Sequence, residues 1–379
     1  MLIDIIAGAR PNFMKIAPVI KEIQKAKNNG ADITCRLIHT GQHYDKNMSG
    51  NFFDQLGIPE PDVNLNAGGG SQAEQTAAIM IGFEKELVAN PVDIVLVVGD
   101  VTSTLACSIV ARKMNIKVAH VEGGIRSGDW SMPEEVNRVV TDSITNYYFT
   151  TSTVANENLK LSGRLDSDIY FVGNTMIDTL LTNVSRLIQP DLWKDLNLLE
   201  QRYFVMTLHR PANVDEGNQL RELIDEILNN SQNLPVIFPV HPRTKKILEI
   251  HGIEAPNLHM VEPLGYLEFN YLVKHAKAVI TDSGGITEET TVMGVPCLTL
   301  RDNTERPETI TTGTNELIGT DPKNIAPYLN RLFNGEWKSG GIPEKWDGKA
   351  AERIIQVLLK LDKADKNKSS STLEKTIPF

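Results

Sequence analysis

Short runs of β-branched and aliphatic residues alternate with longer amphipathic stretches along most of the chain. In the first half, five such runs are typical of buried strands: Leu2–Ala7, Ile33–His39, Asp93–Val98, Lys117–Val121 and Asp168–Val172. Stretches with helical periodicity lie between them, namely Phe13–Lys27, Ala73–Val88 and Ser103–Arg112. This alternation predicts an α/β fold in which helices cover both faces of a parallel sheet.

The same alternation restarts in the second half of the chain. Its apolar runs are Tyr203–Thr207, Val236–Val240, Leu258–Val261, Ala278–Thr281 and Pro296–Leu300. Because 379 residues exceed what one hydrophobic core usually supports, we expect two domains. We place the boundary after Gly173, which gives domains of residues 1–173 and 174–354. A last helix is expected within Gly348–Leu361, followed by a frayed, Lys- and Ser-rich tail over residues 367–379.

Charge and composition limit the partners and the compartment. A net charge of −10 argues against a nucleic-acid or anionic-membrane surface, although a few local cations can still bind a phosphorylated small molecule. The three cysteines are far apart and form no CxxC pair, as in proteins of a reducing compartment. No signal peptide or run of about 20 apolar residues is recognisable. We therefore expect a cytoplasmic protein.

Polar residues follow the predicted strands at their carboxyl ends, where α/β sheets bind ligands. Gly8 leads into a helix that carries Arg10 and Lys15. Free amides at a helix start and two nearby cations suit an anion, but a solvated turn explains the spacing equally well. Asp100 follows the strand that ends at Val98, and by itself it could be only a helix cap.

Two further carboxylates belong to the next loop and helix. Glu122 lies in a Gly-rich loop after the strand that ends at Val121, and Glu134 follows Pro133 at a predicted helix start. An acidic residue in the first helical turn also has a purely electrostatic explanation. However, Asp100, Glu122 and Glu134 are all predicted at one edge of one sheet. Several carboxylates together can divide acid and base roles in abstracting a proton from carbon.

In the second half, cationic and glycine-rich segments follow the strands. His209-Arg210 and His241-Pro242-Arg243 end two strands and indicate a ligand with anionic oxygens. Ser283-Gly284-Gly285 opens a helix and can present consecutive amides to a phosphate. Glu289 lies farther along that helix, and Arg306 follows the next strand. A zinc site is not expected, since no HxxxH or CxxC spacing occurs and arginines accompany the histidines.

Together these segments resemble the non-hydrolysing UDP-N-acetylglucosamine 2-epimerase family, in order and from Gly8 to about Ile355. The matching segments of the first half are G-A-R-P-N-x-x-K (8–15), T-G-Q-H-Y-D (40–45), V-G-D (98–100), H-V-E-G-G-I-R-S-G-D (120–129) and P-E-E-x-N-R (133–138). Those that follow are F-V-G-N-T-M-I-D (171–178), H-R (209–210), T-D-S-G-G-I-x-E-E (281–289) and T-E-R-P-E (304–308).

The resemblance implies a fold of the glycosyltransferase B type, in which two Rossmann-like, doubly wound domains face each other across a cleft. It implies that the last helix, about residues 355–366, crosses back to the first domain. No metal and no other cofactor are implied, and relatives are usually homodimers that serve cell-surface polysaccharide biosynthesis. The implied reaction eliminates UDP from the sugar to give 2-acetamidoglucal, and then adds UDP back with C2 inverted.

The resemblance also implies a role for each candidate residue. Asp100, Glu122 and Glu134 become the acid/base group around C2 and C3. His209 stabilises the departing β-phosphate oxygen, assisted by Arg10 and the Ser283, Gly284 and Gly285 amides. The remaining substrate contacts are Glu289 to the ribose, Phe269 and the Leu264 backbone to the uracil, and Lys15, His241 and Arg306 to the phosphates or sugar.

Some positions depart from the family's pattern. Many bacterial relatives bind a second UDP-sugar as an activator, and Gln42, Arg210 and His241 fit that regulatory site. However, Gly68-Gly69-Gly70-Ser71 stands where an arginine is expected. Four alternatives remain: another UDP-2-acetamido sugar such as a diacetamido-uronic acid, a hydrolysing epimerase, a UDP-sugar glycosyltransferase of the same fold, and a catalytically silent UDP-sugar sensor.

Overall fold

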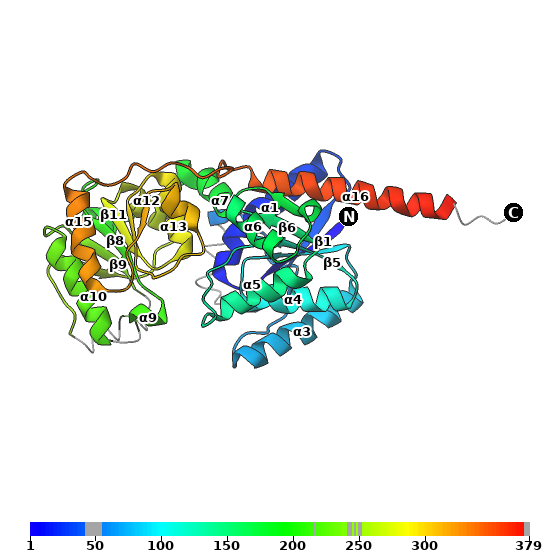
Figure 1. The fold of residues 1–379 in the computed structure, drawn as a ribbon, viewed down its shortest axis with the longest axis horizontal. Helices are drawn as coiled ribbons and strands as arrows, with labels where there is room; N and C mark the ends of the chain where they lie inside the picture. The colour runs from blue at the N-terminus through cyan, green and yellow to red at the C-terminus, as the bar shows by residue number, and fades with distance from the viewer. Residues whose placement is uncertain (42–54, 215–216, 241–244, 246–247, 249–251, 375–379) are drawn as a thin grey trace. The chain divides into compact units, whose positions relative to one another are not determined.

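The computed structural model describes residues 1–41, 55–214, 217–240, 245, 248 and 252–374. The chain forms two compact units, Met1–Thr179 with Glu344–Phe379, and Leu180–Pro343 (Figure 1). Each unit contains one parallel sheet. The predicted α/β class with two doubly wound units is therefore confirmed.

The sheet of the first unit has seven strands in the order β3-β2-β1-β4-β5-β6-β7. They are β1 (Leu2–Ala7), β2 (Thr34–His39), β3 (Val63–Asn64), β4 (Ile94–Val98), β5 (Lys117–Val121), β6 (Tyr147–Thr150) and β7 (Ile169–Phe171). Strand order runs outward in both directions from β1 and β4. Because crossovers between parallel strands are right-handed, this order puts the helices that follow β1 and β4 on opposite faces of the sheet.

The helices of the first unit begin where local signals favour a helix start. They are α1 (Arg10–Asn28), α3 (Gln72–Ala89), α4 (Thr102–Lys113), α5 (Pro133–Ile144), α6 (Thr153–Leu161), α7 (Thr175–Asn183), which runs on into the second unit, and α16 (Ala350–Glu374). Ser71 and Glu74 form a reciprocal capping box before α3. Pro133 occupies the first turn of α5, as predicted. The helix α4 begins at Thr102 after Val101, and no side chain caps it.

The second unit repeats the architecture with six strands in the order β10-β9-β8-β11-β12-β13. The strands are β8 (Phe204–Thr207), β9 (Val236–Pro239), β10 (Leu258–Val261), β11 (Ala278–Thr281), β12 (Cys297–Thr299) and β13 (Asn315–Leu317). Its helices include α8 (Leu192–Asp195), α9 (Pro211–Val214), α10 (Gly217–Asn230), α12 (Tyr266–His275), α13 (Gly284–Met293), α14 (Pro307–Thr311) and α15 (Ile325–Phe333).

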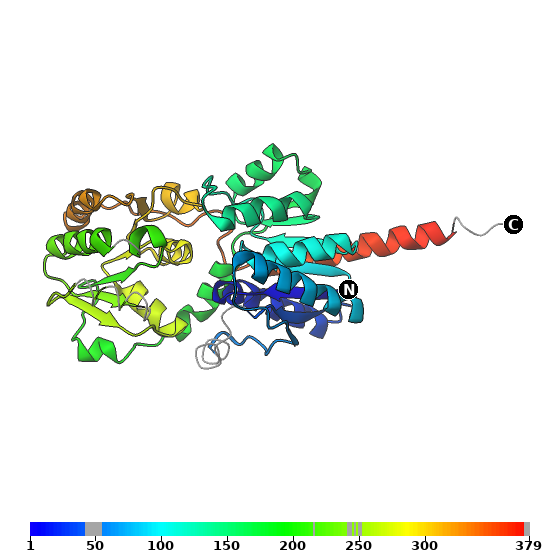
Figure 2. The ribbon, with the colours of Figure 1, turned by 90° about the horizontal axis from the view of Figure 1, so that it is seen from below.

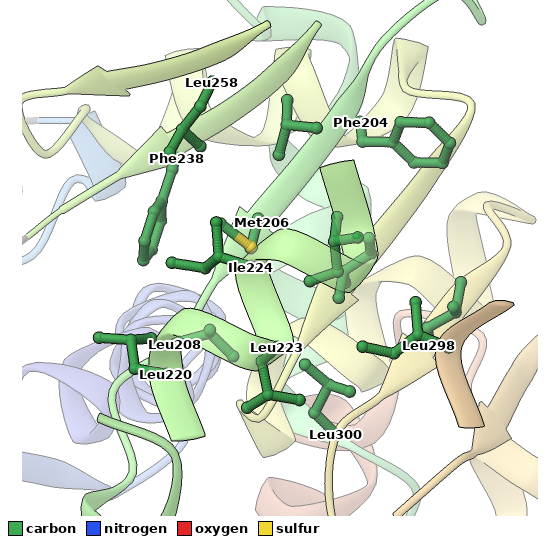
Figure 3. Close-up of a cluster of buried hydrophobic side chains, with 14 of the residues drawn as sticks. Phe204, Met206, Leu208, Leu220, Leu223, Ile224, Phe238, Leu258, Leu298 and Leu300 are labelled. Atoms are coloured by element: carbon green, nitrogen blue, oxygen red, sulfur yellow. The ribbon is translucent and has the colours of Figure 1, made fainter. Parts of the chain in front are cut away.

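Alternate residues of β8 supply the two hydrophobic layers of this unit. Phe204 and Met206 belong to a buried cluster with Leu223 of α10 (Figure 3). Tyr203 and Val205 belong to a second cluster with Leu272 of α12. Since successive strand side chains point to opposite faces, the sheet is buried on both sides. This burial accounts for the continuous apolar runs seen in the sequence.

The chain returns to the first unit at Glu344, because the backbone packs closely there. A Cβ on Gly173 would lie 2.1 Å from the Lys345 carbonyl oxygen, and this glycine has a φ of 98°. Asp178 accepts hydrogen bonds from the Ala350 and Ala351 amides at the start of α16. Thus residues 174–179 and 344–354, which the sequence assigns to the second domain, pack with the first unit. The observed boundaries are 179/180 and 343/344 rather than 173/174 and 354/355.

The last helix is longer than predicted. Figures 1 and 2 show α16 running along the first unit and out past it, and α1 packs against it. Within the tail predicted to fray from residue 367, the helix continues to Glu374. Lys366 pairs with Asp362 one turn earlier at 2.9 Å and with Asp32 at 3.0 Å. Such pairs support a helix that the polar composition alone did not predict.

Candidate active site

In each sheet the strand order reverses between two neighbouring central strands, and this place is the switch point of the sheet. In the first unit these are β1 and β4, and in the second they are β8 and β11. Loops that leave the carboxyl ends of such strands diverge to opposite faces, and ligands of α/β sheets bind in the space that opens there. The loops that follow these four strands, with the neighbouring loop after β5, carry most of the predicted site residues.

In the first unit a lysine and a buried carboxylate form an ion pair. Lys15 on α1 lies with its Nζ 2.7 Å from Oε2 of Glu122, which follows β5. The Glu122 side chain is 2% exposed and that of Lys15 is 11% exposed. A buried carboxylate is stable only with such a partner, so the pair fixes the position of both groups. The structure therefore brings two predicted residues together across two strand ends.

The backbone at this point is in an uncommon conformation. Glu122 has a φ of 72°, which costs a residue with a side chain about 1–3 kcal/mol. Gly99 also has a positive φ, and a Cβ there would lie 3.2 Å from the Lys15 Nζ and 3.6 Å from the Glu122 Oε2. A glycine at residue 99 therefore leaves room for the ion pair. Strain of this kind is concentrated at functional sites.

Asp100 is held by an arginine from α5. Its Oδ2 accepts a hydrogen bond of 2.5 Å from Nη2 of Arg138, and its carbonyl accepts one from Asn137. The same guanidinium contacts Glu135, which also accepts hydrogen bonds from Ser127. The Arg138 side chain is 5% exposed, whereas that of Asp100 is 30% exposed. Asp100 is thus anchored from the protein side and remains accessible.

The two adjacent glutamates of α5 have different environments. Glu135 is buried, and hydrogen bonds from Ser127, Gly128 and Arg138 hold its pKa below the ordinary value, although burial alone would raise it. Glu134 is half-buried, and among the described residues no donor contacts its carboxylate. The structural role therefore falls to Glu135, and Glu134 is the glutamate available to a ligand.

In the second unit a buried aspartate orients His209. The Nδ1 atom of His209 lies 2.7 Å from Oδ1 of Asp282, which is fully buried, while the imidazole is 62% exposed. Asp282 also accepts hydrogen bonds from the amides of His209 and Arg210. Burial alone would raise the pKa of Asp282, but these donors, led by His209, lower it below the ordinary value. A carboxylate on Nδ1 fixes the orientation of the ring and leaves Nε2 for a ligand.

The predicted phosphate loop lies next to this pair. Ser283 precedes α13 without capping it through its side chain. Ser283, Gly284 and Gly285 are partly exposed, and a Cβ on Gly284 would meet no atom within 4 Å. The amides of a first helical turn lack intrahelical acceptors, so this open start can bind an anion. His209 and the helix start lie on adjacent strands, because Thr207 pairs with Thr281.

Glu289 lies two turns into α13 and is almost completely buried. Its Oε1 accepts a 2.8 Å hydrogen bond from the Tyr266 hydroxyl. Burial raises the pKa of Glu289 to about 7, although hydrogen bonds from Tyr266 and Asn270 oppose the shift. Near neutral pH this carboxyl can therefore both accept and donate hydrogen bonds.

The other second-unit candidates are half-buried or engaged in ion pairs. Leu264 and Phe269 are partly buried and pack with Ile286 against one core cluster. Arg210 donates from Nε to the Asp282 carbonyl, and Arg306 donates from Nε to Glu288. These contacts hold the Arg210 side chain against the residue that follows β11, and the Arg306 side chain against α13.

Three predicted positions are described only in part or not at all. Gln42 and His241 lie outside the described residues. The backbone of Arg10 begins α1, and its side chain is not described. In the part of the chain that the structure describes, no group of three His, Cys, Asp or Glu side chains could hold a metal. No helix there is both long and apolar enough to cross a bilayer.

The sequence patterns assign no role to Asp282, Arg138, Glu135, His120 or Asp142, and all of these except Asp142 belong to the matching segments. These residues form the hydrogen bonds and ion pairs that position the candidate site residues. Their partners are 3 to 73 positions away along the chain. Motif composition indicates that such residues matter, but only the fold shows which group each one contacts.

Comparison with known proteins finds similarity along nearly the whole chain. Residues 24–359 match the family model described as UDP-N-acetylglucosamine 2-epimerase. A UDP-N-acetylglucosamine 2-epimerase of Methanocaldococcus jannaschii is 39% identical over 370 residues, covering 94% of this chain and 99% of that protein. A UDP-2,3-diacetamido-2,3-dideoxy-D-glucuronate 2-epimerase of Pseudomonas aeruginosa is 36% identical, covering 95% of this chain and 100% of that protein.

Solved structures agree with these relatives. The crystal structure of the M. jannaschii UDP-GlcNAc 2-epimerase in complex with UDP-GlcNAc and UDP has a TM-score of 0.84 to this chain. It is 40% identical, covering 94% of this chain and 99% of that chain. Similarity at this coverage extends over both units.

The raised pKa of Glu289 predicts a pH-dependent stability. Since the folded-state pKa of about 7 exceeds the ordinary 4.5, the unfolded chain loses this proton first as pH rises. The stabilising contribution is therefore full below pH 4.5 and is lost as pH rises through 7. Glu289→Gln should raise stability relative to the native chain by up to about 3 kcal/mol more at pH 8 than at pH 4.5.

Calorimetric unfolding at the two pH values measures this difference. Glu262→Gln is the matched control, because Glu262 is 77% exposed and its substitution should have the same small effect at both pH values. An equal effect of Glu289→Gln at pH 4.5 and pH 8 would show that the carboxyl titrates normally.

Proposed function

Because the chain belongs to the UDP-N-acetylglucosamine 2-epimerase family, a family of isomerases, we propose that it interconverts UDP-N-acetylglucosamine and UDP-N-acetylmannosamine. The observation that most supports this reaction is the arrangement of acidic groups at the switch point of the first unit. Asp100 and Glu122 are each held by a cation, and Glu134 lies on the helix that supplies Arg138. Acid–base chemistry at carbon needs several such groups.

The second unit supplies groups suited to UDP. In the proposal, the amides at the start of α13 bind the diphosphate, and His209 donates a hydrogen bond to the β-phosphate oxygen that leaves C1. Asp282 keeps the imidazole oriented for this task. Glu289 binds the ribose hydroxyls, and the partly exposed Phe269 and the Leu264 backbone contact the uracil.

The first unit acts on the sugar. A carboxylate takes the proton from C2, and the C–H electron pair becomes the C1=C2 double bond as the C1–O bond breaks. That bond's electrons leave with the β-phosphate oxygen, giving UDP and 2-acetamidoglucal. Re-addition reverses these steps, with the proton delivered to the opposite face of C2. Because protons must reach both faces, one carboxylate is insufficient, and three are available.

The positions of the cations fit this division of roles. Lys15 and Arg138 hold Glu122 and Asp100, so neither carboxylate can turn without breaking its ion pair. Lys15 and the remaining arginines, Arg10 and Arg306, also offer positive charge to the phosphates or sugar.

Assembly, location and pathway belong to the same proposal. We infer a homodimer in the cytoplasm that supplies activated sugars for cell-surface polysaccharides. The support is the family membership and, for the location, the absence of a disulfide among the described cysteines.

A second candidate substrate is a UDP-2,3-diacetamido-uronic acid. The specific support is the 36% identity over 365 residues to the P. aeruginosa enzyme that carries this substrate in its name. The elimination at C1 and C2 would be the same, and only the groups around C3 and C6 would differ. Side-by-side turnover of the two substrates separates the candidates.

The reaction predicts isotope exchange at C2. Incubation with UDP-N-acetylglucosamine in D2O should place deuterium at C2 and accumulate UDP-N-acetylmannosamine, both followed by NMR. Release of free N-acetylmannosamine with UDP would instead indicate a hydrolysing epimerase. Complete absence of exchange with either nucleotide sugar would contradict the proposal and favour a glycosyltransferase or a sensor.

Removing one acid/base group should abolish turnover but not nucleotide binding. We expect Asp100→Asn and Glu122→Gln each to lower kcat by about 10²–10⁴, the usual contribution of a general acid or base. The affinity for UDP, measured calorimetrically, should stay near that of the native chain. Glu157→Gln is the control, since Glu157 is an exposed carboxylate paired with Lys160. Native exchange rates in both site variants would rule out the assigned roles.

A further inference from the structure

A histidine behind the first-unit carboxylates has an unusual set of hydrogen bonds. His120 on β5 is fully buried. Its Nδ1 lies 2.8 Å from Oδ1 of Asp142, and its Nε2 lies 2.8 Å from the Gly99 carbonyl oxygen. A carbonyl can only accept, and an ionised carboxylate can only accept. Both ring nitrogens must therefore donate, which requires a protonated imidazole.

The surroundings of Asp142 favour its ionised form. Its other oxygen, Oδ2, accepts hydrogen bonds from the Gly124 amide at 3.0 Å and from Arg126 at 2.6 Å. Burial alone would raise the pKa of Asp142, but His120 and Arg126 lower it below the ordinary value. The Tyr148 hydroxyl donates to the Asp142 carbonyl. The Arg126 guanidinium and the His120 ring thus contact the same carboxylate in this cluster.

The cluster of His120, Asp142 and Arg126 hydrogen-bonds to both backbone segments that carry the acid/base residues. Through His120 it holds the Gly99 carbonyl, directly before Asp100. Through Asp142 it holds the Gly124 amide, two residues after Glu122. Gly99 and Glu122 both have positive φ values, of 68° and 72°. Such backbone conformations persist only where surrounding contacts fix them.

We propose that His120 is a permanently protonated imidazolium that, with Asp142 as its counter-ion, positions Asp100 and Glu122 for the reaction. Neither residue needs to touch the substrate, so both are positioning residues. Arg126, Tyr148 and, beyond Gly99, the Lys15–Glu122 pair are the other ionisable groups around them. The positioning role rests on the proposed function, whereas the charge of His120 does not.

Selective [15N]histidine labelling tests the charge directly. In the native protein at pH 8.5, long-range 1H–15N correlation should show one histidine whose two ring nitrogens are both protonated. The signal is assigned by its loss in His120→Gln. A neutral His120, with one unprotonated nitrogen at pH 8.5, would overturn the proposal. This measurement needs no substrate, so it stands even if the protein has a different activity.

Kinetics of His120→Gln and Asp142→Asn test the positioning role. We expect kcat and the C2 exchange rate, each per UDP-binding site, to fall on the order of 100-fold, as small misplacements of reacting groups do. KM and the Kd for UDP should change less than about twofold. A purely structural role would lower the thermal midpoint and the number of binding sites but leave kcat per site unchanged, and that result would overturn the proposal.

The chain offers a matched control in His275, whose Nδ1 lies 3.1 Å from Glu200 on the surface of the second unit. His275→Gln should leave kcat unchanged and should retain the NMR signals of the two protonated ring nitrogens of His120. If His120→Gln does not fold, Asp142→Asn supplies the assignment, because it should shift the Nδ1 signal of His120. Absence of exchange by the native chain would refute the proposed function and leave the NMR result to decide the charge.

Discussion

The parallel register of the central strands is the constraint on which the candidate site depends. Val98 pairs with Val121, so Gly99 and Glu122 leave adjacent strands at the same level. Thr207 pairs with Thr281, so Asp282 leaves its strand level with Leu208, directly before His209, in the second unit. A shift of one residue in either pair would turn every side chain to the other face and separate these groups. The buried apolar runs that fix the register therefore also fix the chemistry.

On this framework three candidate groups are each held by an ionisable partner. Lys15 holds Glu122, Arg138 holds Asp100, and Asp282 holds His209. Breaking a buried pair by removing one partner typically costs about 3–5 kcal/mol, because the other charge remains buried. Such ion pairs add little to the stability of the fold, since apolar residues in their place would stabilise it as well. They do give reacting groups one orientation, and this explains why ionised side chains are concentrated at the switch points.

Much of the fold and part of the site could be predicted from the sequence. The runs Leu2–Ala7 and Ala278–Thr281 are strands with those bounds, because each is mostly apolar and is followed by a loop residue, Gly8 or Asp282. The strand β6 (Tyr147–Thr150) was not predicted, since its four residues give little periodicity. Polar strand ends indicated Asp100, Glu122 and His209. The residues that orient them, Arg138, Lys15 and Asp282, act through distant contacts, so composition could not assign their partners. For the same reason the polar sequence after residue 366 indicated fraying where the structure has helix.

The central claim is that C1–O cleavage accompanies the change at C2, with the β-phosphate leaving and returning. The most direct measurement uses UDP-N-acetylglucosamine labelled with 18O at the oxygen that bridges C1 and the β-phosphorus. If UDP departs and adds back, the label should move into the non-bridging β-phosphate positions while epimerisation proceeds, as followed by 31P NMR. Inversion at C2 with the label retained entirely in the bridge would contradict the elimination account.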